Sequence, residues 1–334
     1  MRVDLGYVPL TDAAPVLAAA ELGFAREEGI DLVLSPEPSW ATLRDRLALG
    51  HLDAAHMLAP LALATRLGLS GPQADLVAPM ALNLNGNAIT LSPALWAAMA
   101  PESDDLDTVA TAFARVARDR AGEGRPLTLA TVHPFSCHSY QLRLFAARGG
   151  LDLAQSVRIV VVPPPQTVEA LGRGEIDGVC VGAPWNSIAV AAGLGRIAAL
   201  GCAIVPDCPE KVLAVHASQA EALAPLVEAV NRAGIWCADP ANVGELAELL
   251  SERGGLGPDT DLIRRSLTGH LVVDSAGLRH TDPDYLRLGA EVHRPRPEHG
   301  LWLAEQMAAS GQIANPAEAA AAARGFYRPD LLKA

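Results

Sequence analysis

Five residues of this sequence stand at the ends of predicted strands or at the starts of predicted helices, and their groups could hold a small anion. The groups are an aromatic ring, a carboxamide, an imidazole, a bare backbone N–H and an ammonium, and they belong to Trp40, Asn87, His138, Gly182 and Lys211. Ligands of open α/β sheets bind beyond the carboxyl ends of the strands. The sequence therefore predicts one binding site at these five positions, provided that they converge in space.

A small oxyanion is the ligand that these groups favour. The helix predicted to start at His138 offers unpaired N–H groups and a partial positive charge. Lys211 adds a full charge, which attracts an anion more strongly in a partly dry cleft than in water. Taken singly, Trp40 is as well explained by core packing, and Asn87 beside Gly86 by a turn. A capping role for His138 and a solvated surface position for Lys211 are equally ordinary, so convergence has to decide.

Two segments of the chain repeat one another and indicate how the elements are arranged. The matching positions, all at the same spacing, are Gly50 and Gly174, Leu52 and Ile176, Asp53 and Asp177, and Pro60 and Pro184. Each segment follows an amphipathic helical pattern and leads into a short apolar run, as in a helix that stops at glycine before a buried strand. Two such units in a chain of 334 residues, which is large for one hydrophobic core, predict two α/β lobes with a cleft between them.

The order of the predicted elements sets the limits of the lobes. Strands expected at 3–8, at 31–34 and around His56, with helices between them, favour a parallel sheet. Strands at 88–91, 127–132, 157–162 and 179–181 then build the second lobe, and a strand at 212–216 leads the chain back. We expect residues 1–87 and 216–334 in the first lobe and residues 88–215 in the second, joined by a two-stranded hinge.

Composition argues against several classes of function. The formal net charge of −12, from 26 basic and 38 acidic residues, disfavours direct nucleic-acid binding. The five cysteines contain no CxxC pair, so no disulfide framework is expected. No apolar stretch reaches the roughly 20 residues of a membrane span, and the residues after Met1 form a strand pattern rather than a secretory signal. These features predict a cytoplasmic protein without a membrane partner.

Motifs for catalysis or for a resident cofactor are not found. The segment 133–138 contains two histidines and a cysteine but lacks the second spaced pair of a zinc site. Ser136 near His133 or His138 is a faint hydrolase pattern with no acid in a recognisable place. GxSxG, HExxH and Walker motifs are absent from the sequence. We therefore expect no catalytic residue, no cofactor and no metal.

Several segments resemble the nitrate/bicarbonate solute-binding proteins of ABC importers. The resemblance follows the same order along most of the first 240 residues and is carried by residues 9–15, 39–41, 53–60, 81–90, 138–143, 162–166, 177–186 and 209–213. It implies a two-lobed, type II periplasmic-binding-protein-like fold with the ligand between the lobes. In that family a tryptophan, an amide, a histidine, a backbone glycine and a lysine hold nitrate, and the matching positions are Trp40, Asn87, His138, Gly182 and Lys211.

Two departures from the family bear on the ligand. Asn87 stands where the family often has the longer glutamine. Ala183 stands at the position where the resemblance implies a glutamate, which the bicarbonate-binding members of the family use to bind calcium. Bicarbonate also carries an O–H that needs an acceptor, whereas the five groups named above are mainly donors. The resemblance therefore implies nitrate or nitrite as the ligand.

The resemblance leaves the biological role open between three alternatives. Because no leader is visible, the chain is most similar to the cytoplasmic NasS-type nitrate/nitrite sensors, which hold a NasT-type ANTAR RNA-binding regulator until the anion binds. Lobe closure would then alter a protein-binding surface. The alternative is the substrate-binding component of a nitrate or bicarbonate ABC importer. An enzyme on the same fold is less favoured, because it would need a nucleophile or an acid–base pair in the cleft.

Overall fold

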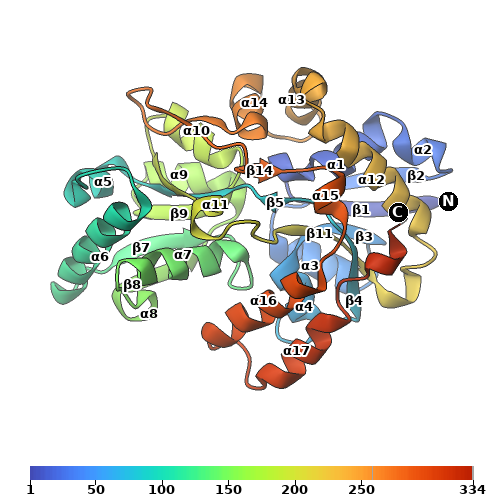
Figure 1. Ribbon diagram of the computed structural model, residues 1–334, viewed down its shortest axis with the longest axis horizontal. Helices are drawn as coiled ribbons and strands as arrows, with labels where there is room; N and C mark the ends of the chain where they lie inside the picture. Colours follow the sequence, from blue (N-terminus) through green and yellow to red (C-terminus); the bar gives the residue numbers. More distant parts are fainter. Residues whose placement is uncertain (258, 333–334) are drawn as a thin grey trace.

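The computed structural model describes residues 1–257 and 259–332, which form two α/β lobes side by side (Figure 1). The sheet of the first lobe has the strand order β2-β1-β3-β11-β4. Its strands are β1 (Arg2–Tyr7), β2 (Asp31–Pro36), β3 (Ala54–Leu58), β4 (Leu76–Ala81) and β11 (Lys211–His216). Strand β1 is parallel to β2 and β3, as predicted, whereas β11 runs antiparallel to both β3 and β4.

The sheet of the second lobe has the order β10-β6-β9-β7-β8. Its strands are β6 (Asn87–Leu91), β7 (Leu127–Thr131), β8 (Val157–Val161), β9 (Gly178–Gly182) and β10 (Arg196–Leu200). Strand β7 is parallel to β8 and β9, and β6 is antiparallel to β9 and β10. Both sheets therefore combine a parallel unit with antiparallel strands next to the crossings between the lobes.

The repeated aspartates, Asp53 and Asp177, make equivalent hydrogen bonds in the two lobes, which explains the sequence repeat. The Asp53 carboxylate accepts the backbone N–H of Asp4 in β1 at 2.8 Å. The Asp177 carboxylate accepts the backbone N–H of Thr128 in β7, also at 2.8 Å. In each lobe the turn after the helix is thereby tied to the first parallel strand, so the following strand enters the sheet in register.

Helices cover both sheets and leave the strand ends free to face the other lobe. In the first lobe these are α1 (Ala14–Glu21), α3 (Trp40–Ala48), α4 (Ala59–Arg66) and α12 (Ala224–Ala238). In the second they are α5 (Pro93–Met99), α6 (Leu106–Gly122), α7 (Cys137–Arg148), α9 (Thr167–Gly172) and α10 (Trp185–Ala191). Helices α3 and α7 begin with serine caps, because Ser39 and Ser136 accept the backbone N–H groups of Thr42 and Ser139. These caps fix the first turns that carry Trp40 and His138.

The predicted lobe boundaries need correction. Strand β11 lies inside the first sheet, so the return crossing precedes Lys211 instead of lying near residue 215. The outgoing crossing, residues 82–86, and the return segment, residues 207–210, run side by side: Asn85 N–H donates to Cys208 O at 2.9 Å, and Leu84 bridges Pro209. The boundary was misplaced because a buried apolar strand looks the same in sequence whichever sheet it joins.

A later part of the chain also returns to the second lobe, although residues 216–334 were all expected in the first. Strand β14 (Leu286–Arg287) pairs with β5 (Leu84–Asn85) and so adds a third segment to the hinge. The hairpin of β12 (His270–Val272) and β13 (Arg279–Thr281) reaches the edge strand β10, where Ile197 N–H donates to Val273 O at 2.9 Å. This hairpin was not predicted, since its short strands lie in a stretch that reads as mainly helical.

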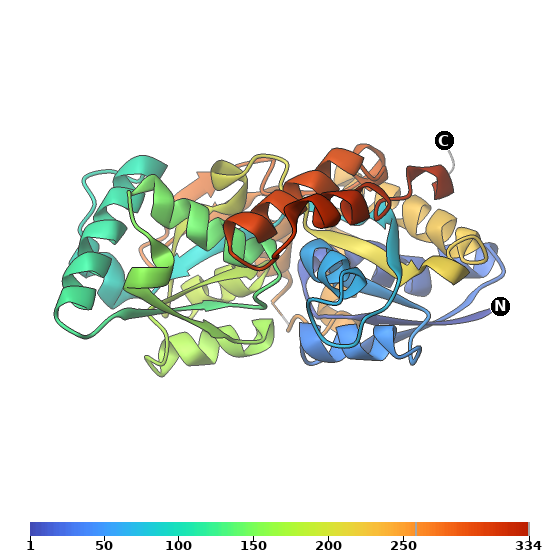
Figure 2. The same cartoon turned by 90° about the horizontal axis from the view of Figure 1, so that it is seen from below.

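Helices α16 (Pro297–Ala309) and α17 (Pro316–Arg324) lie on one side of the molecule, across the junction of the two lobes (Figure 2). The C-terminal part also contains α13 (Val243–Glu252), α14 (Thr260–Thr268) and α15 (Ala290–His293). Helices α16 and α17 pack on α4 of the first lobe, and the loop after α16 reaches α7 of the second, where Tyr140 Oη donates to Gln312 Oε1 at 2.9 Å. In the described part of the chain, no helix combines the length and the apolar character that a membrane crossing requires.

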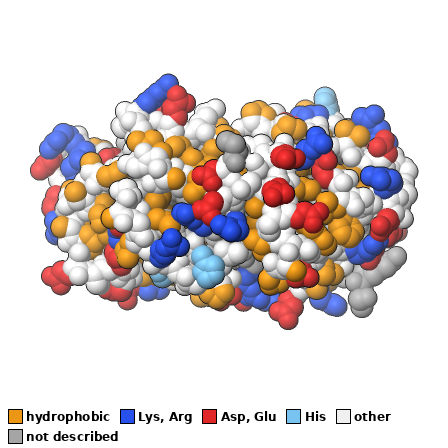
Figure 3. Space-filling view, turned by 90° about the horizontal axis from the view of Figure 1, so that it is seen from above, with side chains coloured by type: hydrophobic (Ala, Val, Ile, Leu, Met, Phe, Trp, Pro, Cys, Tyr) orange, Lys and Arg blue, Asp and Glu red, His pale blue; other side chains and the backbone are white. Residues whose placement is uncertain are grey.

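Acidic and basic side chains are interspersed on the face shown in Figure 3, where no field of one sign extends over both lobes. This agrees with the small size of the basic clusters in the sequence. A phosphate backbone would meet carboxylates as often as cations on this face.

Candidate functional site

The five predicted positions meet at the junction of the two lobes. Trp40 opens α3, and Lys211 opens β11 in the first lobe; Asn87 opens β6, His138 lies in the first turn of α7 and Gly182 ends β9 in the second. All four side chains are buried, with at most 1% of their surface exposed. The Lys211 ammonium lies 6.0 Å from the centre of the Trp40 ring. An anion could therefore enter only when the lobes separate.

Lys211 does not stand alone, because two carboxylates contact its ammonium. Asp12 Oδ2 lies 2.7 Å from Lys211 Nζ, and Glu210 Oε2 lies 2.8 Å from it. The other oxygen of Asp12 bonds His56 Nε2 at 2.8 Å. A buried chain of groups thus runs from His56 through Asp12 and Lys211 to Glu210, and all four are at most 1% exposed.

The amide of Asn87 is held by neighbours from both lobes. Its Nδ2 donates to Glu210 Oε1 at 2.5 Å and to Gln141 Oε1 at 3.2 Å. Gln141 lies one helical turn after His138 in α7, so both side chains point to the same side. Asn87 therefore joins the hinge segment at Glu210 to the helix that carries His138.

Several buried polar atoms at this junction lack hydrogen-bond partners among the described residues. They are Trp40 Nε1, both ring nitrogens of His138, Gln141 Nε2, Asn87 Oδ1 and His56 Nδ1. An unsatisfied buried polar group costs about 1–3 kcal/mol, and native proteins contain few of them. A cluster of such atoms around a buried cation indicates a site for a small polar ligand.

Gly182 supplies backbone to this site. In the antiparallel ladder of β6 and β9, Gly182 is paired with Asn87. In the next pair, Ala183 N–H donates to Gly86 O at 2.9 Å. Because hydrogen-bonded and non-bonded pairs alternate in an antiparallel ladder, the Gly182 N–H points away from β6. That direction leads towards β7, whose pairing with β9 covers only residues 129–130 and 178–179.

A side chain at position 182 would enter the site. A Cβ built there lies 3.6 Å from Asn87 Oδ1 and 3.7 Å from Asp12 Oδ2, while Leu10 Cδ2 is at 3.2 Å. Glycine therefore keeps the space between these oxygens open for a ligand.

Burial and pairing set the charges of the site. Burial alone would raise the pKa of Asp12, but Lys211 and the bond from His56 lower it to about 2. Burial alone would lower the pKa of Lys211, but the two carboxylates raise it. The pKa of His138 falls well below its usual value because of burial and then because of Lys211. At neutral pH the site therefore holds an ammonium, an ionised Asp12 and neutral His138.

Glu210 differs from Asp12 in the direction of its pKa shift. Burial raises the pKa of Glu210, and the neighbouring Lys211 offsets this only in part. The pKa of His56 is lowered by burial in spite of its bond to Asp12, so that imidazole is neutral as well.

Sequence reasoning missed Asp12, His56, Gln141 and Glu210. All four belong to segments already singled out: Asp12 in 9–15, His56 in 53–60, Gln141 in 138–143 and Glu210 in 209–213. Their presence changes the ligand argument, because Asp12 and Asn87 bring acceptor oxygens to the site. The statement that the site offers mainly donors was therefore incomplete, and it does not by itself favour nitrate over bicarbonate.

One group of possible metal ligands lies beside the site. Cys137, Cys208 and Glu210 offer ligand atoms within 4.8 Å of one another, and no other such group occurs in the described residues. Burial raises the pKa of both thiols, which disfavours the thiolates that a metal needs. Glu210 moreover contacts the Lys211 ammonium, which would repel a cation. We assign no metal to this group.

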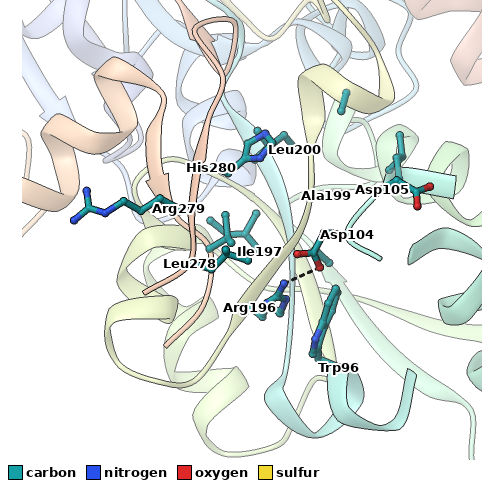
Figure 4. A pocket seen from close by; sticks show the side chains of 14 residues that line it. Trp96, Asp104, Asp105, Arg196, Ile197, Ala199, Leu200, Leu278, Arg279 and His280 are labelled. Atoms are coloured by element: carbon teal, nitrogen blue, oxygen red, sulfur yellow. Dashed lines mark hydrogen bonds and ion pairs between the residues drawn. The ribbon is translucent and has the colours of Figure 1, made fainter. Parts of the chain in front are cut away.

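The second lobe carries a separate surface cavity of about 370 Å³ between β10 and the β12–β13 hairpin (Figure 4). Arg196 crosses it, stacked at 4.1 Å over the ring of Trp96 and paired with Asp104 at 2.8 Å. None of the predicted site residues lines this cavity. Arg196 is paired with Asp104 and Asp274, and its Nε is the one lining atom among the buried polar atoms without a partner in the described residues, so the cavity does not show the cluster of such atoms that marks the junction site.

Comparisons with known proteins show the family of this chain. The model of the NMT1-like family matches residues 1–251. The nitrate/nitrite binding protein NrtA of Synechococcus elongatus is 30% identical over 98% of this chain and 76% of its own length. The nitrate import ATP-binding protein NrtC of Synechocystis sp. is 34% identical over 99% of this chain. The bicarbonate transport ATP-binding protein CmpC of Synechococcus elongatus is 34% identical over 95%.

The match covers different shares of these relatives. It includes 49% of NrtC and 46% of CmpC, so the chain spans about half the length of these ATP-binding relatives. Among solved structures, the periplasmic nitrate-binding protein NrtA from Synechocystis PCC 6803 superposes with a TM-score of 0.89, at 26% identity, over 99% of this chain and 86% of that one. The alkanesulfonate-binding protein SsuA from Xanthomonas axonopodis, at 14% identity and a TM-score of 0.68 over 96% and 97%, shares the fold. The chain belongs to the NMT1-like family, among the nitrate and bicarbonate solute-binding proteins, with the two-lobed type II periplasmic-binding-protein fold that the sequence predicted.

Proposed function

We propose that this chain binds a small oxyanion, with nitrate or nitrite first, as the substrate-binding component of an ABC importer. The observation that carries the proposal is the set of buried donors without partners in the described residues, at Trp40, His138 and Gln141, around the ammonium of Lys211. An oxyanion supplies the acceptors that these donors lack. Charge-assisted bonds of this kind are stronger than neutral ones in a buried site.

The relatives support transport over sensing. The names of the relatives reported above refer to nitrate and bicarbonate binding, import or transport. The expectation of a cytoplasmic sensor with a NasT-type partner depended on the N-terminal residues alone, which decide neither localisation nor partner. The chain has no phosphate-loop signature, so we do not propose for it the ATP binding that two of these names contain.

A binding role also fits the chemistry better than catalysis. Among the described residues, no hydrogen bond joins a serine or cysteine side chain to His56 or His138. The nucleophile–base pair that an enzyme would use is therefore not formed. Both histidines are placed to bind a ligand or to hold Asp12 in position.

Nitrate precedes bicarbonate in the proposal for two reasons. Ala183 offers no carboxylate where the resemblance implies one for calcium. The structural relative with a TM-score of 0.89 is a nitrate-binding protein. The acceptor oxygens of Asp12 and Asn87 make bicarbonate the competitor to test.

The experiment is calorimetric titration of the protein with nitrate, nitrite, sulfate and bicarbonate, the last with and without calcium. We expect nitrate or nitrite to bind. Tight binding of bicarbonate alone, with calcium required, would refute the proposed ligand.

Two glycine variants test whether the ligand binds beside Gly182. In Gly182→Ala the new methyl group occupies anion space beside Asn87 Oδ1, so affinity should fall at least about tenfold, which corresponds to about 1.4 kcal/mol. Gly244→Ala is the matched control, because a Cβ there meets nothing within 4 Å. Equal affinities of the two variants would mean that the anion lies elsewhere.

A further inference from the structure

Glu210 gives the empty site one negative charge in excess. With neutral histidines, the ammonium of Lys211 balances one of the two carboxylates that contact it, Asp12 at 2.7 Å and Glu210 at 2.8 Å. A bound anion would add a second unbalanced charge at a place where no side chain is more than 1% exposed. Like charges in a dry site repel strongly, so an anion that enters alone is disfavoured.

We propose that the anion enters together with a proton, and that the carboxylate of Glu210 receives this proton. The inference rests on the proposed function and adds its coupling to pH. In the loaded state Asp12 and Lys211 form a neutral pair, Glu210 is a neutral acid and the anion is the single remaining charge. The empty and loaded sites then carry the same net charge.

The contact between Glu210 and Asn87 offers a way to hold the proton. Asn87 Nδ2 donates to Glu210 Oε1 at 2.5 Å, so the carboxamide and the carboxylate are in direct hydrogen-bond contact. Rotation of the Asn87 carboxamide by half a turn would bring its Oδ1 to this position, where a protonated Glu210 donates to it. The Asn87 Nδ2 hydrogens would then face the anion, in place of an oxygen that has no partner among the described residues.

Gln141 can follow this rotation. Its Oε1 now accepts from Asn87 Nδ2 at 3.2 Å, while its own Nε2 lacks a partner in the described part of the chain. Turning the Gln141 amide places Nε2 against the rotated Asn87 Oδ1. The proton on Glu210 thereby converts an acceptor-lined wall into a donor-lined wall for the anion.

Other groups near Glu210 are less suited to receive the proton. Asp12 is held ionised by Lys211 and His56, and burial keeps His56 and His138 neutral. The titratable groups that face Glu210 or its partners are Lys211 and Cys208 on its own segment, Asp12, His56 from β3, Cys137 and His138 from α7, Cys180 from β9 and Tyr327. The thiols and the phenol have raised pKa values and are already protonated.

The sign of the pH dependence follows. Anion binding raises the pKa of Glu210 further, so between its values in the empty and loaded states the affinity falls as pH rises, by up to tenfold per unit. Nitrate is the appropriate probe, because it is the conjugate base of a strong acid and cannot carry the proton itself.

The test is nitrate calorimetry from pH 5 to 9 in buffers with different ionisation enthalpies, which counts the protons taken up per anion. We expect uptake that approaches one proton in part of this range, and a loss of that uptake in Glu210→Gln, with an affinity that no longer depends on pH. Glu248→Gln, on the exposed side of α13, should behave as the wild type.

A second measurement does not depend on the variant. The nitrate-induced infrared difference spectrum of the wild type should show a new C=O band of a protonated carboxyl group. Zero proton uptake at every pH, or unchanged uptake in Glu210→Gln, would overturn the inference while the proposed function stands. Failure of the wild type to bind any tested oxyanion would instead refute the proposed function.

Discussion

Replacement of Lys211 by methionine should abolish nitrate binding and also destabilise the empty protein. Methionine keeps most of the length of the side chain and removes its charge. An anion about 4 Å from the ammonium, at an effective dielectric constant of about 20, gains about 4 kcal/mol. Loss of this term weakens binding by roughly a thousandfold. Nitrate affinity measured by calorimetry is the first assay.

The stability effect arises from the two carboxylates that remain. Removing one partner of a buried ion pair costs roughly 3–5 kcal/mol, because the other charge stays buried. In the variant, Asp12 and Glu210 would have folded pKa values above their unfolded values. Their protonation relieves the cost at low pH, so the variant should lose stability as pH rises from about 5 to 8. The wild type should lose less stability over this range, because the raised pKa of Lys211 keeps its contribution throughout and Asp12 is held ionised, so that only Glu210 has a raised carboxyl pKa.

Urea unfolding at pH 5.5 and 8 measures this difference. Arg26→Met is the control, because Arg26 is exposed on α2 (Phe24–Glu27). The chain contains only two lysines, Lys211 and Lys333, so labelling of lysine with ¹³C gives two sets of side-chain signals, one of which should shift when nitrate binds. A variant that binds nitrate within tenfold of the wild type, or that is as stable as the control at both pH values, would refute the reasoning.

Three further predictions concern other groups of the site. Trp40→Phe keeps a ring but removes an N–H that is unpartnered in the described residues, so calorimetry should show about tenfold weaker nitrate binding while urea unfolding shows no loss of stability without the anion. Gln312→Ala removes two hydrogen bonds of 2.9 Å that link the C-terminal part to the second lobe, one from Tyr140 Oη and one from Gln312 Nε2 to Pro134 O. Nitrate binding should weaken severalfold, and unaltered affinity would contradict this. Asp12 has a folded pKa of about 2, below its unfolded value of 3.8, so it contributes roughly 2 kcal/mol above pH 4 that is lost as pH falls towards 2. Acid unfolding of Asp12→Asn should lack this contribution, and an acid transition identical to that of the wild type would count against it.

Local signals in the sequence were sufficient for most elements of the fold. The serine caps before Trp40 and His138, the glycine stops and the repeated aspartates each act on backbone within their own segment or its first strand. Strands β4 and β10 and the β12–β13 hairpin were missed; β4 and β10 pair with strands more than a hundred residues away in the chain, so local patterns do not identify them.

Local signals in the sequence also identified part of the candidate site. Its residue types were visible in the chain, and so was a hint that went unused: Lys211 is one of two lysines among 26 basic residues. A compact ammonium in a chain that otherwise uses arginine suggests a place where a guanidinium does not fit.

The sequence by itself determined that there are two α/β units, where several helices and most strands of the two sheets begin, and which five groups could meet an anion. Only the tertiary structure decided that Asp12 and Glu210 flank Lys211 and that Gln141 supports Asn87. The reason is that propensity and periodicity act over a few residues, whereas the charge of a buried site depends on every group within a few ångströms, and these groups come from parts of the chain up to about two hundred residues apart.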